Sequence, residues 1–175
     1  MPLNSSLNLT NSKILHQGMK QAGIRVAATL PETWLVPLVN LIKDDPEMKL
    51  VEVSREEEAV GICMGAHLGG IRSAVVIQNH GLFACVNPLI SLGNLYKLPV
   101  LLFISYRGNF GENDPWHTTG GRVTEPLLQA INVPYQCVTD PERVITQIAD
   151  AQALAESSLT PVALLLTRQL MLERQ

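Results

Sequence analysis

Charged residues are scarce in this chain. Asp, Glu, Lys and Arg make up 17% of its 175 residues, against about a quarter in a typical soluble domain. Charge is depleted where protein surfaces are buried against partners, so this composition favours an obligate assembly that covers much of the surface. The net charge of −3 argues against binding to nucleic acid or to anionic membrane surfaces.

Sequence features of membrane and secreted proteins are also missing. No apolar run reaches the roughly 18 residues that a membrane-spanning helix requires. The segment from Met1 to Lys13 is polar and lacks the basic and apolar regions of a signal peptide. The cysteines Cys63, Cys85 and Cys137 show no C-x-x-C spacing, which fits a reducing compartment. We therefore expect a soluble, cytoplasmic chain.

Metal-binding and phosphate-binding motifs are absent as well. The four histidines, His16, His67, His80 and His117, are scattered without the spacing of metal ligands. No glycine loop of the Walker or dinucleotide-binding type is present. We therefore expect no metal site built from this chain alone.

What is present is an alternation of helical segments with short apolar strands. Continuous apolar strands indicate a parallel sheet that is covered on both faces, and this length is most simply one domain. We expect an α/β fold, a single three-layer domain over residues 1–175 with a mostly parallel sheet and a flexible N-terminus at 1–11. Strands are expected at 24–28, 49–53, 73–77, 100–105 and 162–167, and helices at 12–22, 31–44, 56–68, 87–96, 125–131 and 140–157.

Residues 106–121 show neither a helical nor a strand period. A structureless segment of this length is unusual inside a compact domain, and binding loops are one common reason for it. The segment contains Arg107, Glu112, Asp114, Trp116 and His117. These side chains favour a binding loop.

Glu56 begins the expected helix that follows the strand at 49–53. A carboxylate at the carboxyl end of a strand faces the crevice where open α/β sheets bind ligands. Taken alone, acidic residues at 56–58 could simply offset the helix dipole, by about 0.3–1 kcal/mol each. His80 and His117 also follow the carboxyl ends of strands, which share one rim of a parallel sheet, and this favours a functional site over the dipole explanation.

Gly61, Gly65 and Gly69 recur every fourth residue along the helix that begins at Glu56. Gly69 serves as a stop signal, but the two interior glycines cost about 1 kcal/mol each relative to alanine. Close approach of a neighbouring backbone would compensate for this cost. We therefore expect tight packing on this helix face, including packing on a partner subunit.

Several segments together carry a resemblance to a known family. In order and spacing they are similar to the pyrimidine-binding domain of thiamine-diphosphate-dependent 2-oxoacid decarboxylases, in particular those of sulfopyruvate and phosphonopyruvate. The matching segments are Ser-Arg-Glu-Glu-Glu-Ala-Val-Gly (54–61), Gln-Asn-His-Gly-Leu (78–82), Val-Asn-Pro-Leu-Ile-Ser-Leu (86–92), Ile-Ser-Tyr-Arg-Gly (104–108), Gly-Glu-Asn-Asp-Pro-Trp-His (111–117) and Thr-Glu (124–125).

The resemblance implies roles for particular residues. Glu56 would be the catalytic glutamate that hydrogen-bonds N1′ of the cofactor's aminopyrimidine, and Asn79 would also bind the cofactor. His80 and His117 would be catalytic and contact the substrate, because similar decarboxylases carry active-site histidines there. We add Arg107 as a contact for an anionic substrate group, from its charge and position. His80 replaces the serine that is usual in the sulfopyruvate and phosphonopyruvate enzymes, so the substrate pocket differs.

The Gly-Asp-Gly motif, with which full-length enzymes of this kind bind Mg²⁺ and diphosphate, is absent from the chain. The resemblance therefore implies a β-type partner subunit that carries this motif and binds Mg²⁺, and we also expect self-association. The first hypothesis is the pyrimidine-binding subunit of a decarboxylase that converts sulfopyruvate to sulfoacetaldehyde and CO2. Two alternatives stay open: a split phosphonopyruvate or related 2-oxoacid decarboxylase, and a non-catalytic α/β binding or assembly module.

Overall fold

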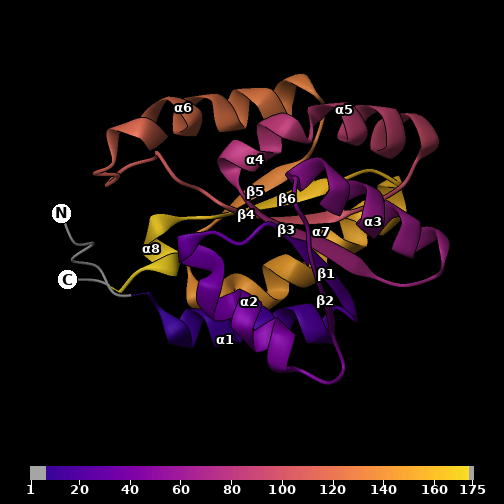
Figure 1. Ribbon diagram of the computed structural model, residues 1–175, viewed down its shortest axis with the longest axis horizontal. Coiled ribbons are helices and arrows are strands. Elements are labelled where there is room, and N and C mark those ends of the chain that lie inside the picture. Colours follow the sequence, from indigo (N-terminus) through magenta and orange to yellow (C-terminus); the bar gives the residue numbers. More distant parts are fainter. Residues whose placement is uncertain (1–6, 174–175) are drawn as a thin grey trace.

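The computed structural model describes residues 7–173, which form one sheet of six parallel strands between two layers of helices (Figure 1). The strands are β1 (Val26–Thr29), β2 (Lys49–Glu52), β3 (Ser73–Gln78), β4 (Leu101–Ser105), β5 (Tyr135–Val138) and β6 (Val162–Leu166). Their order across the sheet is β2-β1-β3-β4-β6-β5. This arrangement confirms the expected α/β fold with a parallel sheet and helices on both faces.

The helices divide between the two faces of the sheet. Those on one face are α1 (Leu9–Gln21), α2 (Val36–Asp44) and α7 (Val144–Ser158), and the other face carries α3 (Glu56–Leu68), α4 (Asn79–Ala84), α5 (Val86–Pro88) and α6 (Pro115–Ala130). Shorter elements are the 3₁₀ turns η1 (Thr33–Leu35) and η3 (Pro141–Arg143), the π-helical stretch η2 (Leu89–Asn94), and α8 (Arg168–Met171). Among the described residues, no helix is long and apolar enough to cross a lipid bilayer.

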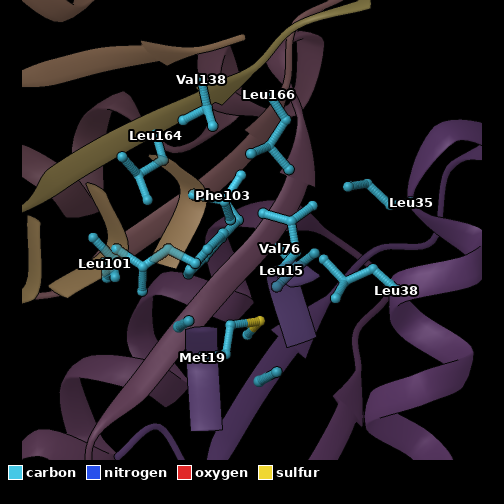
Figure 2. Close-up of a cluster of buried hydrophobic side chains, with 14 of the residues drawn as sticks. Leu15, Met19, Leu35, Leu38, Val76, Leu101, Phe103, Val138, Leu164 and Leu166 are labelled. Carbon is cyan, nitrogen blue, oxygen red and sulfur yellow. The ribbon is translucent and has the colours of Figure 1, made fainter. Parts of the chain in front are cut away.

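The central strands point alternate side chains into two separate hydrophobic clusters. In β4, Leu101 and Phe103 face α1 and α7, whereas Leu102 and Ile104 face α3 and α6. Figure 2 shows Phe103 among leucine and valine side chains of the first cluster. Burying a side chain of this size stabilises the fold by about 1.5–3 kcal/mol, so the all-apolar strands require cover on both faces.

Local capping explains where the helices begin. The helix at 56–68 has the predicted bounds. The first helix begins three residues earlier than predicted, at Leu9, because the side chain of Asn8 accepts a hydrogen bond from the N–H of Asn11. Of the segment predicted to be flexible at 1–11, residues 1–6 lie outside the described part, and residues 9–11 already belong to α1.

The prediction of a structureless segment over 106–121 is wrong in its second half. Helix α6 begins at Pro115 and continues through Gly120 and Gly121. The glycine pair hides the helical pattern in the sequence, yet it is required because the backbones of Gly121 and Gly108 lie in direct contact. The loop proper is therefore confined to residues 106–114.

Two other predictions differ from the structure. The helix expected at 87–96 starts earlier and is divided, since α4 begins at Asn79 and is followed by α5 and η2. Strand β5, a short edge strand with only Val138 fully buried, was not predicted because it lacks a continuous apolar run. Neither difference moves the carboxyl ends of the central strands.

Candidate active site

The carboxyl ends of β1, β3 and β4 form one rim of the sheet. From β1 the chain crosses to β2 on one side and then returns to place β3 on the other side. Such a reversal of strand order opens a crevice at the carboxyl ends of the strands, where open α/β sheets bind ligands. His80 follows β3, and Arg107 and His117 follow β4, whereas Glu56 follows β2, the neighbour of β1 in the same sheet.

The three consecutive acidic residues at the start of α3 have different surroundings. Glu58 accepts hydrogen bonds from the backbone N–H groups of Ser54 and Arg55, at 3.0 and 3.3 Å, and Glu57 forms an ion pair with Arg55 at 2.7 Å. The carboxylate of Glu56 has neither kind of partner among residues 7–173. Capping and ion pairing therefore engage the carboxylates of its two neighbours, whereas Glu56 shares with them only the favourable position at the helix N-terminus.

Glu56 is half-buried and lies against Gly81 in α4. A β-carbon added to Gly81 would stand 2.5 Å from Cγ of Glu56 and 2.6 Å from Oε1. The glycine thus leaves the space that the glutamate side chain occupies. Through this contact, α4 fixes the position of the carboxylate at the start of α3.

A Gly81→Ala substitution should therefore shift the Glu56 side chain without destabilising the fold. The new methyl group would displace a flexible side chain, so we expect a nearly unchanged melting temperature. Misplacement of a reacting group by about 1 Å can lower a rate by about 10²-fold, and we expect a loss of that order in any activity that uses Glu56. Thermal unfolding and turnover of the same preparation measure the two effects, and wild-type turnover would show that the contact is irrelevant.

His80 and His117 lie side by side, with ring centroids 5.1 Å apart and ring planes at 63°. His80 follows β3 in α4, and His117 is in the first turn of α6 rather than in a loop. The His80 ring packs on Gly120, where no side chain would fit. Burial is the main cause that lowers the pKa of both imidazoles, and the positive charge of Arg107 lowers each pKa further.

Arg107 holds the loop between β4 and α6 together. Its guanidinium group donates hydrogen bonds to both carboxylate oxygens of Glu112, at 2.8 and 3.2 Å, and to Asp114 at 2.9 Å. It also stacks on the buried ring of Trp34, with 4.5 Å between Cζ and the ring centroid. The side chain is 5% exposed, so these contacts engage it in the structure, and substrate contact by Arg107 stays a prediction.

The ionisation of Glu112 follows from the same contacts. Burial opposes its charged form, but hydrogen bonds from Arg107 and from the N–H groups of Gly108 and Asp114 outweigh burial and lower the pKa of Glu112 to about 2. Glu112 is therefore a carboxylate under all ordinary conditions. The two ends of the loop are held together by this buried charged pair.

Comparison with known proteins identifies the family of the chain. The chain is 34% identical to the sulfopyruvate decarboxylase subunit alpha of Methanococcus maripaludis, over 89% of this chain and 93% of the relative. It is 32% identical to the corresponding subunit of Methanothermobacter thermautotrophicus, over 91% of this chain and 97% of the relative. The chain belongs to the sulfopyruvate decarboxylase alpha-subunit family. No protein-family model matches the sequence.

More distant matches extend beyond the alpha-subunit family. The phosphonopyruvate decarboxylase of Streptomyces viridochromogenes is 34% identical over 70% of this chain, which spans 31% of that longer protein. A solved 2-oxoglutarate:ferredoxin oxidoreductase from Magnetococcus marinus matches 98% of this chain and 31% of its own, with a TM-score of 0.69 and 19% identity. The structural match shows that the oxidoreductase contains the same fold as this chain.

The remaining predicted site residue of this family member, Asn79, is fully buried. Its amide nitrogen donates to the backbone carbonyl of Arg107 at 2.8 Å and to Oγ1 of Thr124 at 2.9 Å. The side chain thereby ties α4 to the loop after β4 and to α6. A contact between Asn79 and a cofactor stays a prediction.

Glu32, which follows β1 on the same rim, was not predicted from the sequence as a site residue. Glu32 caps η1, since the N–H of Leu35 donates to Oε1 at 3.1 Å. Burial raises the pKa of Glu32, and neither this backbone hydrogen bond nor the nearby charge of Arg107 cancels the effect. Its place three residues after an apolar strand was the signal that could have identified it. Over residues 7–173, no group of three His, Cys, Asp or Glu side chains converges as a metal site.

Proposed function

We propose that this chain is the pyrimidine-binding subunit of a cytoplasmic, thiamine-diphosphate-dependent decarboxylase that converts sulfopyruvate to sulfoacetaldehyde and CO2. All 175 residues would form one domain, and a separate subunit would bind the diphosphate and Mg²⁺. Three observations support the proposal: family membership over 89–91% of the chain, the fold shared with a 2-oxoacid oxidoreductase, and the geometry of Glu56.

The observation that carries the proposal is the unpartnered carboxylate of Glu56 beside Gly81. When bound, thiamine diphosphate supplies the electron sink for decarboxylation, and the protein supplies orientation and proton transfer. The residues fit this cofactor, since a half-buried carboxylate without another partner can hold a proton at N1′ of an aminopyrimidine ring. The histidine pair on the same rim would face the reacting 2-oxoacid.

The need for a partner follows from what the chain does not supply. The Gly-Asp-Gly motif is absent from the sequence, and Mg²⁺ bound with a phosphate normally requires carboxylates as well. We infer that these carboxylates belong to a β-type subunit. The names of the relatives as alpha subunits support this inference.

The exposed face of α3 is the surface that we propose for subunit contact, including self-association. Among the described residues, no heavy atom lies within 4 Å of where a β-carbon would stand on Gly61 or Gly65. Ile62, on the same helix, and Leu95 and Tyr96, after the adjacent η2, are exposed. The close packing predicted for the glycines is thus not made within the described chain, and an approaching subunit would provide it.

A split phosphonopyruvate decarboxylase is the second candidate, because the match to the Streptomyces enzyme is equally high in identity. The two candidate functions differ only in the anionic group of the substrate. A non-catalytic assembly module is disfavoured by Glu56, whose carboxylate has no hydrogen bond or ion pair within residues 7–173.

Reconstitution with a Gly-Asp-Gly subunit, encoded next to this chain or taken from a relative, tests the proposal. We expect the isolated chain to bind thiamine diphosphate poorly and to release no CO2. The mixture should bind the cofactor in a Mg²⁺-dependent manner. Calorimetric titration measures binding, and CO2 release from sulfopyruvate, phosphonopyruvate and pyruvate, compared in parallel, identifies the substrate.

Each outcome has a distinct meaning. Tight Mg²⁺-dependent binding by the chain alone would contradict the split site. Cofactor binding by the mixture without CO2 release from any 2-oxoacid would favour the non-catalytic module. Faster release from phosphonopyruvate than from sulfopyruvate would replace the proposed substrate.

A further inference from the structure

Gln78, the last residue of β3, lies between the two histidines of the rim. Its side-chain nitrogen Nε2 is 2.9 Å from Nδ1 of His80 and 3.3 Å from Nδ1 of His117. The two rings meet edge to face. One amide group therefore contacts the corresponding nitrogen of both rings. Nδ1 of His80 also lies 3.3 Å from Oδ1 of Asn79, a longer contact than its 2.9 Å to the Gln78 amide.

This contact determines where the imidazole protons are. An amide nitrogen can only donate, so each Nδ1 that it reaches accepts the hydrogen bond and carries no proton. The two hydrogens of Nε2 suffice for both rings. In a neutral imidazole, an unprotonated Nδ1 leaves the proton on the other ring nitrogen. Gln78 thus selects the same tautomer, protonated on Nε2, in His80 and His117.

The two Nε2–H groups have different surroundings. The Nε2 side of the His80 ring packs on Gly120 of α6. For the His117 ring, Gln78 is the only hydrogen-bond partner within residues 7–173. The Nε2–H of His80 therefore faces the backbone of α6, whereas the Nε2–H of His117 is available to a bound molecule.

We propose that Gln78 is a positioning residue that holds both histidines as neutral Nε2–H tautomers, so that His117 presents a hydrogen-bond donor to the substrate and does not act as a base. The catalytic part of this inference rests on the proposed decarboxylase function. A fixed N–H donor stabilises negative charge that develops on a substrate oxygen. The tautomers themselves are inferred from the shorter contact that His80 Nδ1 makes with the Gln78 amide and from the single contact of His117 Nδ1.

The charges around the pair agree with neutral rings. Arg107 acts on both histidines and disfavours their protonation, together with burial, while Glu112 acts on both in the opposite sense and Asp114 acts on His117. Adding a proton to Nδ1 of His117 would force the amide of Gln78 to turn over, because no other hydrogen-bond partner of that nitrogen lies within residues 7–173. The amide would then no longer donate to the other ring, so the two tautomers are coupled.

Nitrogen-15 NMR of the full chain, with labelled histidine and without a partner subunit, tests the tautomers directly. At neutral pH we expect Nδ1 of His80 and His117 to resonate as an unprotonated nitrogen and Nε2 as an N–H. Histidine substitutions assign the four side chains. A proton on Nδ1 of either ring in the wild-type chain would overturn the proposal, whatever the activity of the reconstituted enzyme.

The variant Gln78→Glu provides a second test of the proposed tautomers. A carboxylate only accepts, so the proton should move to Nδ1, and the pKa of His117 should rise by about one pH unit because of the added negative charge. Gln21→Glu makes the same change at the exposed end of α1 and should alter neither ring. In the reconstituted enzyme, Gln78→Glu should shift the pH profile of turnover. Unchanged tautomers and pKa values in Gln78→Glu, or in Gln78→Met if the first variant does not fold, would also overturn the proposal.

Discussion

Glu56→Gln is expected to lower decarboxylase turnover by about 10²- to 10⁴-fold, the usual contribution of a general acid–base group. The amide is nearly isosteric with the carboxylate but cannot exchange a proton with N1′ of the cofactor. Because the Glu56 carboxylate has no partner among the described residues, the melting temperature should change little. Turnover and hydrogen–deuterium exchange at C2 of the bound cofactor, both in the reconstituted complex, measure the effect.

Glu57→Gln is the matched control, since it makes the same change one residue along the same helix. Glu57 is engaged in an ion pair with Arg55, a contact worth about 0–1 kcal/mol at a surface. We expect turnover near the wild-type value. Equal losses in the two variants would show that the helix terminus, rather than the Glu56 carboxylate, is what the reaction requires.

Arg107→Met is expected to lower the free energy of unfolding by about 3–5 kcal/mol, because breaking a buried ion pair leaves an uncompensated charge. Glu112 would lose the guanidinium that it faces at 2.8 Å. Urea unfolding at neutral pH measures the loss. Arg122→Met, at an exposed position on α6, is the control and should change stability by less than about 0.5 kcal/mol.

The loss of stability in Arg107→Met should become smaller as the pH falls. The pKa of Glu112 is lowered from 4.5 to about 2 in the folded chain. A carboxyl with a depressed pKa contributes stability above its ordinary pKa and loses it as pH falls toward the folded value. The difference in the free energy of unfolding between wild type and Arg107→Met should therefore be largest above pH 4.5 and decrease toward pH 2. An Arg107→Met chain as stable as wild type would instead leave the guanidinium free for the predicted substrate contact.

The central part of the fold could be predicted because each of its strands is apolar throughout. Ser73–Gln78 and Leu101–Ser105 can only be buried on both faces, and this requires a parallel sheet with helices on each side. Helix α6 could not be predicted at its start. Its early turns contain Gly120 and Gly121, which are poor helix formers, and their value lies in contacts with His80 and Gly108 that only the folded chain makes.

The candidate site was predictable in its location but not in its internal contacts. The carboxyl ends of parallel strands share a rim, so Glu56, His80 and His117 could be expected near one another. Neither the engagement of Arg107 with Glu112 nor the burial of Asn79 could be predicted, because both depend on the path of the loop at 106–114. The histidine contact of Gln78 depends on the orientation of one amide, which spacing does not specify.

The two hydrophobic clusters are unequal, and this inequality sets where the molecule opens. The larger cluster joins α1, α2 and α7 to the sheet, while the site side includes interior glycines in α3 and α6 and a proline, Pro126, inside α6. Local opening follows the regions with fewer buried contacts. Among the helices, α1 and α7 should therefore have the amide hydrogens that exchange with solvent most slowly. The layer that carries the histidines could then open and reclose around an incoming cofactor while the sheet and its opposite layer stay folded.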